Sequence, residues 1–359
     1  MRLFHFIRLV VLLCPALGLV SCVSTAYRSM KSEDAMPELA ALKAMTRAAG
    51  KETFQVPVTA MGVTTTLAVH QVGNGRRGRA LVLVHGMLSG DQTWRFIAGE
   101  LARDYDLYLL NLPGCGDSAP IEAGKLPPDF FAPPNLAELV SQGIEGILRR
   151  RHDAPALALV AHSLGGAVVL QMFEPGIRAR HRAVMSRVDH LVLFAPCDVA
   201  QPKQDADLKS LSEAASWKIQ LAKSMGKLKD LSAKAMRASM VQPENVPREE
   251  ADRGVSMLTD RGLRETGQAM VAQAVPWTKD ERPDWPRIKQ LTAVYSQVHV
   301  PCLIVWGERD ETLSHAMGYK LAAQLPNAKL VIVPAAMHSM HLERPQKTVS
   351  LIRGFVGQG

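Results

Sequence analysis

The stretch that most constrains the fold of this chain is 161–166, with the sequence AHSLGG. It follows a continuous apolar run at 156–160 and opens a second, longer apolar segment at 167–173. The first run has the length of a buried strand, and the second continues as a helix would. A serine between a strand and a helix, with small residues around it, is typical of a sharp and strained turn. The small residues avoid collisions across the turn, so the hydroxyl of Ser163 would stand at the top of a sheet.

Apolar runs with the length of strands recur along the chain, and segments with helical spacing separate them. The expected strands lie at 80–84, 105–110, 156–160, 190–196, 301–306 and 329–333. The expected helices between and after them lie at 91–104, 136–151, 314–325 and 345–356. Strands without a polar face are buried on both sides, as in parallel sheets covered by helices. The alternation predicts an α/β fold with a mainly parallel sheet flanked by helices, and one or two antiparallel edge strands at 54–72.

A long segment between two of the expected strands has a different character. About a hundred residues separate the strands at 190–196 and 301–306, and a structureless loop of that length is uncommon in a compact domain. Apolar residues recur in this segment at helical spacing: Ile219, Ala222, Met225, Leu228, Leu231 and Ala235. We therefore expect an inserted helical cap at 198–295, which divides the core of the fold into parts at 51–197 and 296–359.

The N-terminal residues resemble a bacterial lipoprotein signal. Two arginines precede an apolar stretch at 9–20 that is shorter than a membrane span. The stretch ends in Leu-Val-Ser-Cys, which resembles the lipobox, in which the cysteine carries the lipid. The resemblance implies a signal peptide at 1–21, lipidation of Cys22 and a tether at 22–50. It also implies a lipid-anchored protein of the bacterial cell envelope, at the outer membrane and facing the periplasm. A plain cleaved signal with a free Cys22 is the alternative.

Charge and cysteine content argue against several classes of function. The formal net charge is +8, but no basic run is interleaved with aromatic residues, so we expect no nucleic-acid partner. Apart from the two N-terminal cysteines, the chain has Cys115, Cys197 and Cys302, an odd number that argues against a disulfide framework. Neither these cysteines nor the pair His338 and His341 has a recognised metal-ligand spacing, so we expect no metal. No phosphate loop or dinucleotide fingerprint occurs, and we expect no cofactor.

The serine motif resembles that of the α/β-hydrolase superfamily, with Ala161 in place of the usual first glycine. A second match lies at 85–87, where His-Gly-Met follows a strand, as in the family loop that forms half of the oxyanion hole. The resemblance implies that the backbone amides of Met87 and Leu164 stabilise the oxyanion, each by roughly 3 to 4 kcal/mol. It also implies a structural role for His85, which would otherwise be mistaken for a catalytic base.

In this superfamily the catalytic residues follow one another as nucleophile, acid and histidine. Serine needs a base within hydrogen-bond reach, and an acid must hold that base in the right tautomer. The family pattern makes Ser163 the nucleophile, Asp310 in a Gly-x-x-Asp turn the acid, and His338 the base, although Met337 replaces the glycine that usually precedes the histidine. Each of the three follows an expected strand. All three would therefore lie at the carboxyl-terminal edge of the sheet, where such sheets bind ligands.

Three rival assignments stay open at this point. Glu308 lies two residues before Asp310, and Asp198 follows the preceding core strand, where some relatives carry their acid. His341 competes with His338 as the base, and is otherwise a structural or substrate-side residue. The sequence does not decide among these assignments, and the positions of the side chains in the folded chain are needed.

The nucleophile narrows the chemistry that the resemblance implies. Dehalogenases and epoxide hydrolases of this fold use aspartate, and Ser163 argues against both. We expect a serine hydrolase that cleaves a small-molecule carboxylic ester, with lipid esters among the candidates, through an acyl-enzyme. An acyltransferase and other acyl or carbon–carbon bond hydrolases share the same residues and stay open. A non-catalytic envelope binding protein is the remaining alternative, and the loss of a triad residue that would indicate it is not found.

Overall fold

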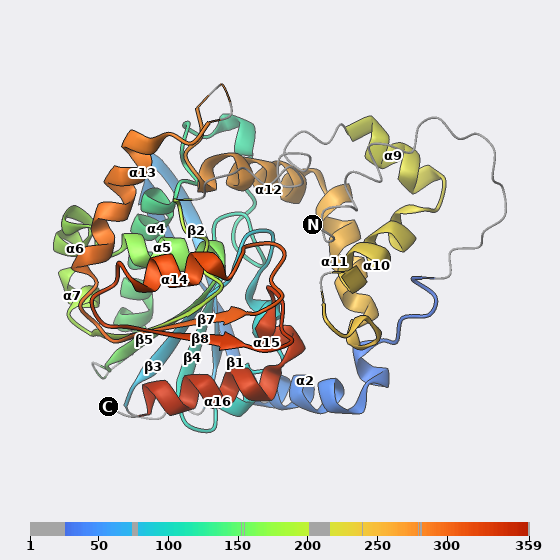
Figure 1. Ribbon diagram of the computed structural model, residues 1–359, viewed down its shortest axis with the longest axis horizontal. Helices are drawn as coiled ribbons and strands as arrows, with labels where there is room; N and C mark the ends of the chain where they lie inside the picture. The colour runs from blue at the N-terminus through green and yellow to red at the C-terminus, as the bar shows by residue number, and fades with distance from the viewer. Residues whose placement is uncertain are drawn as a thin grey trace.

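The computed structural model describes residues 26–73, 78–151, 153, 155–200, 216–238, 240–278, 280 and 282–357. Within these residues the chain forms one eight-stranded sheet with the order β1-β2-β4-β3-β5-β6-β7-β8. Helices cover the sheet, and a separate group of helices lies to one side of it, on the right of Figure 1. The expected signal peptide and its Cys22 lie outside the described residues.

The sheet is parallel except at one edge. Its strands are β1 (Gly50–Ala60), β2 (Val63–Val72), β3 (Ala80–Val84), β4 (Asp106–Leu110), β5 (Leu157–His162), β6 (Val188–Phe194), β7 (Cys302–Gly307) and β8 (Ala328–Val333). β2 pairs antiparallel with both β1 and β4, and the other neighbouring strands pair in parallel. The predicted α/β fold, with a mainly parallel sheet and antiparallel edge strands, is confirmed.

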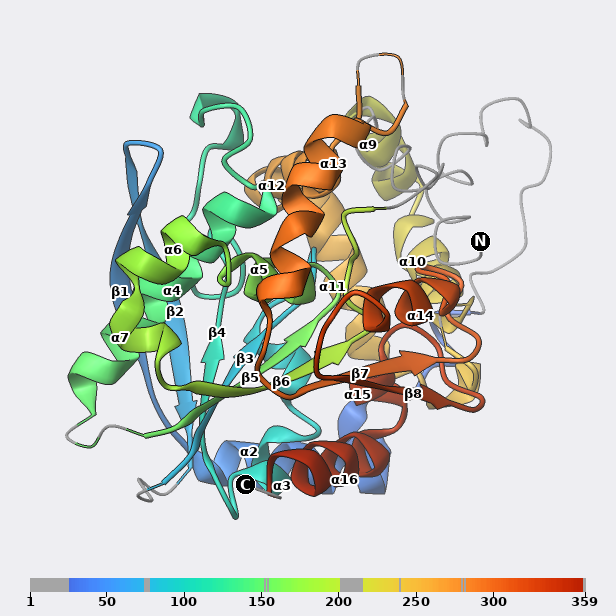
Figure 2. The ribbon, with the colours of Figure 1, turned by 60° about the vertical axis from the view of Figure 1, so that its left-hand side comes forward.

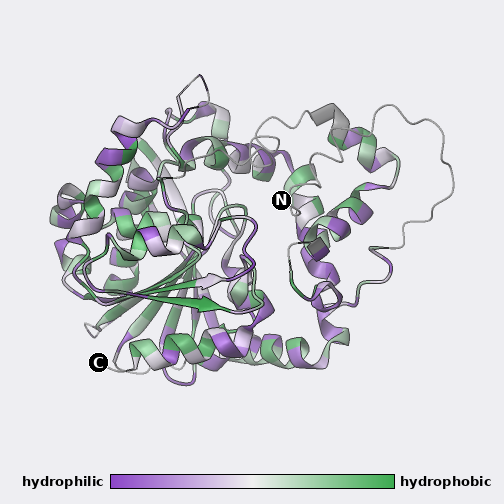
Figure 3. Cartoon of the chain, in the orientation of Figure 1, coloured by the Kyte–Doolittle hydropathy of each residue, from purple (hydrophilic) through white to green (hydrophobic). Residues whose placement is uncertain are grey.

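Each central strand sends its side chains alternately into two hydrophobic clusters, one on each face of the sheet. In β3, Ala80, Val82 and Val84 belong to one cluster, and Leu81 and Leu83 belong to the other. All five side chains are fully buried, and a fully buried aliphatic side chain of the size of valine or leucine contributes about 1.5 to 3 kcal/mol. Figure 3 shows the strands as predominantly apolar and the outer helices as mixed. The strands lack a polar face because both of their faces are covered.

Helices from different parts of the chain cover the two faces. One cluster takes side chains from α4 (Pro133–Arg150), α5 (Leu164–Gln171), α6 (Pro175–Arg180), α7 (Arg182–Met185) and α14 (Ala316–Ala322). The other takes side chains from α3 (Ala98–Leu101), α15 (Met340–Glu343) and α16 (Pro345–Val356). The chain order of strands and helices thus produces three layers, with the sheet in the middle (Figure 2).

The helix expected at 91–104 is wrong as a single element. The chain forms a 3₁₀ turn, η2 (Asp91–Trp94), followed by the short α3. In a continuous helix the amide of Gly99 would donate to the carbonyl of Arg95. Instead the hydroxyl of Thr46, on α2 (Pro37–Ala49), accepts from the Gly99 amide and donates to the Arg95 carbonyl, at 2.7 Å in both cases. A side chain from another helix has replaced the local hydrogen bond.

The segment between β6 and β7 contains most of the separate helical group, and we call its helices α9 to α12 the cap. The described helices of the segment are α9 (Ser216–Ser224), α10 (Leu228–Ala238), α11 (Arg248–Thr259), α12 (Arg261–Ala274) and α13 (Trp285–Thr292), with a 3₁₀ turn η4 (Pro243–Asn245) before α11 and η5 (Ala293–Gln297) after α13. α9 to α12 share a small apolar core of their own, which includes Ile219, Leu231, Leu258 and Val271. In Figure 1, α9, α10 and α11 extend away from the sheet, whereas α13 lies against the core helices.

Residues 26–36, which precede α2, pack on α10 and α11 rather than on the sheet. Met30 is buried in a cluster with Ala233, Val246 and Ala251. The segment includes a 3₁₀ turn, η1 (Glu33–Ala35), and leads into α2, which lies beside α16 and the end of the sheet (Figure 1). None of the helices described here combines the length and the apolar character needed to cross a bilayer.

Candidate active site

Ser163 lies at the turn between β5 and α5 in a strained backbone conformation. Its φ is 51° and its ψ is −119°, a region that costs a residue with a side chain about 1 to 3 kcal/mol. The backbone around it is tied to the next strand, because the Ser163 amide donates to the carbonyl of Phe194 at 3.0 Å. The Ser163 carbonyl accepts from the amides of Gly166 and Cys197, each at 2.9 Å. These bonds hold the turn in place against the strain.

The glycines near the turn are required by close backbone approaches. A Cβ at Gly165 would lie 2.5 Å from the carbonyl oxygen of Val84, at the end of β3. A Cβ at Gly166 would lie 2.5 Å from the Cβ of Pro196. Gly86 sits in the same way against Ser163, where an added Cβ would be 3.0 Å from the serine Cβ. The loops after β3 and β6 therefore converge on the turn that carries Ser163.

Asp310 and His338 meet beside this turn. Asp310 follows β7 and His338 follows β8, and the Nδ1 of His338 lies 2.8 Å from Oδ2 of Asp310. The other carboxylate oxygen of Asp310 accepts from the amides of Thr312 and Leu313, each at 2.9 Å. The Asp310 side chain is fully buried, so these three bonds compensate the cost of removing its charge from water. With Nδ1 donating to Asp310, the Nε2 of His338 is free to accept a proton.

His162 places the His338 loop against the turn. The rings of His162 and His338 have centroids 4.7 Å apart, and the Nε2 of His162 lies 3.1 Å from the backbone oxygen of His338. His162 is the residue immediately before Ser163. The structure therefore brings together the three predicted segments, those of Ser163, Asp310 and His338, at the carboxyl-terminal edge of the sheet. Burial lowers the pKa of His162 well below its usual range, so its imidazole stays neutral.

The rival residues all have other partners. Glu308 accepts from the amide of Ala335 at 3.2 Å. Asp198 accepts from the hydroxyl of Tyr295 at 2.8 Å, and burial raises its pKa. The Nε2 of His341 lies 2.7 Å from the hydroxyl oxygen of Thr93. These contacts favour Asp310 and His338 as the acid and the base.

Two further histidines near the site are buried and uncharged. Burial, reinforced by the neighbouring His338, lowers the pKa of His341 to about 3. Burial lowers the pKa of His85 to about 4. The Nε2 of His85 accepts from the amide of Leu112 at 3.0 Å, and its Nδ1 contacts the oxygen of Gly86 at 2.7 Å. His85 thus ties the loop after β3 to the loop after β4, which is a structural role.

The two amides predicted to form the oxyanion hole lie on either side of the turn. Leu164 is the first residue of α5, and Met87 follows Gly86, which packs directly on Ser163. The next residue, Leu88, has a φ of 57°, and its side chain contacts Gly267 of α12. Met87 and Leu88 also pack against the apolar core of α9 to α12. The cap helices therefore support the loop that carries the Met87 amide.

Sequence reasoning assigned no structural role to two residues that shape this site, although Glu343 and Pro345 match the family's Glu-x-Pro after the histidine. His162 occupies the variable position of the serine motif, and no pattern indicates that its ring contacts His338. Glu343 accepts from the amide of Met337 at 2.8 Å and from the amide of Val241 at 2.7 Å. It thereby links the His338 loop to the segment between α10 and α11, and burial raises its pKa. Its spacing after His338 is the signal that could have indicated such a role.

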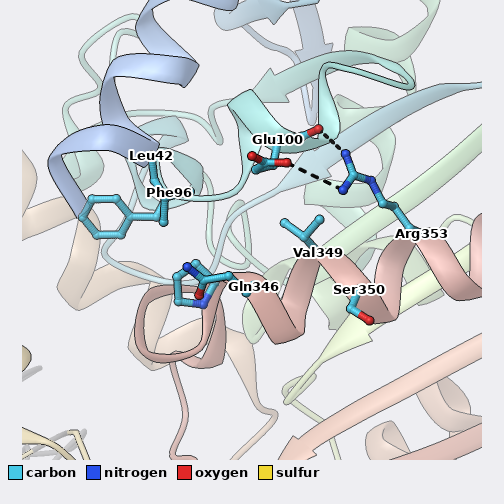
Figure 4. A pocket seen from close by; sticks show the side chains of 8 residues that line it. Leu42, Phe96, Glu100, Gln346, Val349, Ser350 and Arg353 are labelled. Carbon is cyan, nitrogen blue, oxygen red and sulfur yellow. Dashed lines mark hydrogen bonds and ion pairs between the residues drawn. The ribbon is translucent and has the colours of Figure 1, made fainter. Parts of the chain in front are cut away.

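Two hollows of the surface lie away from these residues. One, of about 480 Å³, lies between α2, α3 and α16, and Figure 4 shows Leu42, Phe96 and Val349 beside the ion pair of Glu100 and Arg353. The other, of about 860 Å³, lies between the β1–β2 hairpin, α4, α6 and η5. Neither is lined by a residue of the proposed triad. Among the described residues, no group of three or more histidine, cysteine, aspartate or glutamate side chains is arranged to hold a metal ion.

Comparison with known proteins shows the family to which the fold belongs. Residues 81–351 match the alpha/beta hydrolase family. The chain is 26% identical over 289 residues to the dihydrolipoyllysine-residue acetyltransferase component of the acetoin cleaving system of Pseudomonas putida, a match that covers 79% of this chain and 64% of that protein, or just under two thirds of its length. It is 24% identical over 286 residues to the pimeloyl-[acyl-carrier protein] methyl ester esterase of Aeromonas salmonicida, covering 78% of this chain and 96% of that protein.

A solved structure shows the same fold. The esterase RhEst1 from Rhodococcus sp. ECU1013 superposes with a TM-score of 0.63 at 18% identity, over 86% of this chain and 99% of that one. The family match extends from β3 to α16 and so includes every segment that converges on Ser163. The chain belongs to the alpha/beta hydrolase family.

Proposed function

We propose that this protein is a serine hydrolase that cleaves a carboxylic ester through an acyl-enzyme on Ser163. The observation that carries the proposal is the 2.8 Å contact between His338 and Asp310, beside a serine held at a strained strand-to-helix turn. Asp310 holds the proton on Nδ1 of His338, which leaves Nε2 as the base that Ser163 needs. A serine hydroxyl is a weak nucleophile without such a base.

The reaction would proceed in two acyl transfers. His338 removes the proton of the Ser163 hydroxyl as its oxygen attacks the ester carbonyl, and the amides of Met87 and Leu164 donate to the resulting oxyanion. The intermediate collapses when the alcohol departs with a proton from His338. A water molecule then attacks the acyl-enzyme by the same proton transfers and releases the acid. Asp310 stabilises the imidazolium that forms in both halves.

The esterase class is supported by the nucleophile and by the relatives. Serine forms acyl esters, and the name of the Aeromonas salmonicida relative, a methyl ester esterase, refers to ester cleavage. We include lipid esters in the substrate class because the chain carries the sequence pattern of a lipid anchor.

We further propose that a lipid on Cys22 anchors the protein in the bacterial cell envelope, at the periplasmic face of the outer membrane. The support is the sequence alone. An apolar stretch at 9–20 ends in Leu-Val-Ser-Cys, which resembles a lipobox. The residue after the cysteine is Val23 and not aspartate, which by the same resemblance favours sorting to the outer membrane. If Cys22 carries the anchor, Cys22→Ser should move the protein from the membrane fraction to the soluble fraction. Equal membrane retention of the two forms would contradict lipidation.

The catalytic proposal is tested by ester turnover in two serine variants. Ser163→Ala should lose turnover of short and long acyl esters, while Ser339→Ala, next to His338, should keep it within a few-fold. A series of acyl chain lengths measured with the parent protein then reports the depth of the acyl pocket. Turnover that persists unchanged in Ser163→Ala would contradict the proposal.

A further inference from the structure

The segment that follows the proposed anchor is docked on the cap. The hydroxyl of Tyr27 donates to Asp252 of α11 at 2.7 Å, and its amide donates to Asp230 of α10 at 3.1 Å. The carbonyl of Met30 accepts from Arg248 at 2.8 Å. Met30 is 2% exposed in an apolar cluster with cap residues. Residues 26–36 therefore form a strap that is fixed to α10 and α11.

Buried ion pairs hold the same strap to the core. Arg95 contacts Glu33 of the strap at 2.6 Å and Glu250 of α11 at 2.5 Å, and all three side chains are largely buried. Removal of one of these side chains would leave an uncompensated buried charge, which is costly. The three side chains therefore hold the strap, the end of η2 and α11 to one another. Strap, cap and core are thus joined at this point.

The distance from the proposed anchor to the cap is short. Tyr27 is the fifth residue after Cys22, and an extended chain spans at most about 18 Å over five residues. A lipid on Cys22 would therefore hold the Tyr27 end of the cap within that distance of a bilayer. Figure 1 shows α9, α10 and the strap together at the end of the molecule that lies farthest from β1 and its neighbours.

The C-terminal end of α9 and the turn after it carry exposed apolar and basic side chains. Ile219 is buried and Ala222 packs against the apolar core of the cap, whereas Leu221 and Met225 point outward and are 44% and 54% exposed. The Met225 amide bonds to the Leu221 carbonyl at 3.0 Å, so the two side chains lie one helical turn apart on the same face. Lys223 lies on another side of the same last turn, and Lys227 follows the end of the helix. Both lysines are exposed and form no ion pair with any described residue.

We propose that this end of the cap, with Leu221 and Lys223 on the last turn of α9 and Met225 and Lys227 just after it, rests on the anionic surface of a lipid bilayer. Apolar side chains enter the headgroup region and lysines bind anionic lipids, which is the pattern of helices that lie on membranes. The inference rests on the anchor proposed for Cys22 and not on the catalytic residues. The apolar core that packs beneath α9 also packs against Met87 and Leu88, on the loop that carries one of the two proposed oxyanion-hole amides.

The test compares two exposed methionines in the full-length, lipidated protein. Met225→Cys and Met61→Cys are each labelled with an environment-sensitive dye, and the unsubstituted protein gives the background. Met61 is 47% exposed at the β1–β2 turn and serves as the matched control. The native Cys115, Cys197 and Cys302 are buried, so they should react slowly with the dye. The proteins are then reconstituted in vesicles of phosphatidylcholine with phosphatidylglycerol.

The expected result is a blue shift of the dye at position 225 and no shift at position 61. The same result is expected in a Ser163→Ala background, so a failure of the catalytic proposal does not affect it. Identical behaviour of the two positions would overturn the proposal, as would a label at 225 that does not respond to vesicles.

A second arm tests the charge. The full chain with Cys22→Ser, which lacks the proposed lipid site, is titrated with anionic and zwitterionic vesicles. Reversal of both lysines, Lys223→Glu with Lys227→Glu, should weaken binding to anionic vesicles about tenfold or more at low salt. The matched control, Lys51→Glu with Lys329→Glu, changes exposed lysines on β1 and β8 and should leave binding within twofold. Equal losses in the two double variants, or equal binding to both vesicle types, would overturn the proposal.

Discussion

Two regions of the molecule are held by different kinds of contact: the edge of the sheet where the proposed triad lies, and the cap. At the sheet edge, backbone groups of neighbouring strand ends bond to one another, and glycines allow the approach, as at Gly165 against Val84. In the cap, side chains from distant parts of the chain hold the helices, as Arg95 does between Glu33 and Glu250. The sheet edge should therefore be rigid, and the cap should depend on a few ion pairs.

Because of this difference, variants that change catalysis should be distinct from variants that change the position of the cap. Variants at the sheet edge should change turnover or global stability. Variants in the cap contacts should change local stability first, because the cap has an apolar core of its own.

The largest effect is expected at Asp310. Asp310→Asn removes the charge that stabilises the imidazolium and favours the wrong tautomer of His338, so kcat should fall by about 10⁴-fold. Glu308→Gln, two residues away, should keep turnover within a few-fold because Glu308 bonds to Ala335 instead. Steady-state kinetics with a soluble ester measures both. A similar loss in both variants would contradict the assignment of the acid.

The next largest effect is expected where the cap joins the core. In Arg95→Met the buried carboxylates of Glu33 and Glu250 lose one of the positive charges that compensate them. The free energy of unfolding should fall by about 3 kcal/mol. Hydrogen exchange should become faster in α11 before it changes in β5. Arg103→Met, which breaks an exposed pair with Glu100, should cost less than about 1 kcal/mol. Uniform loss of protection across cap and sheet would show that the two regions are not separable in this way.

Disruption of the close packing at the sheet edge should give a smaller loss of stability. In Gly165→Ala the new Cβ meets backbone oxygens of β3 and the following residue, which should destabilise the fold by about 1 to 3 kcal/mol. Gly354→Ala, in α16, has open space around the new Cβ and should stabilise by up to about 1 kcal/mol. Chemical unfolding of both variants tests this. Equal effects of the two substitutions would contradict the role of Gly165 in the turn.

The effect that is smallest at neutral pH is a pH dependence of stability, which the buried histidines impose and which grows as pH falls. In the unfolded chain His341 binds a proton as pH falls below about 6.5, whereas in the folded chain its pKa is about 3. The unfolded state therefore binds more protons between these values, and stability should decrease as pH falls from 6.5 toward 3. His341→Gln should reduce this slope by up to about 1.4 kcal/mol per pH unit. The exposed His299→Gln serves as control and should leave the slope unchanged.

Much of the sheet edge was predictable because its determinants are local. Continuous apolar runs such as β3 identify buried strands, and the serine motif carries the small residues that its turn needs. The positions of Asp310 and His338 after their strands follow from the chain order of the family. The parallel sheet then places strand ends at one edge, so that local patterns combine into a candidate site.

The contacts that could not be predicted join residues far apart in the sequence. No pattern indicates that Thr46 interrupts the helix at 91–104, or that His162 contacts the His338 loop. The strap is a further example, because Tyr27 and Asp252 lie 225 residues apart. Such contacts depend on how the helices pack in space, which periodicity does not specify.

The central claim is that Ser163 is the nucleophile activated by His338, and trapping it covalently is the most direct test. The full-length protein is treated with a fluorophosphonate, digested and analysed by mass spectrometry. The adduct should lie on the peptide that contains Ser163, and it should be lost in Ser163→Ala and form much more slowly in His338→Gln. An adduct on another residue, or labelling that continues unchanged in Ser163→Ala, would contradict the account.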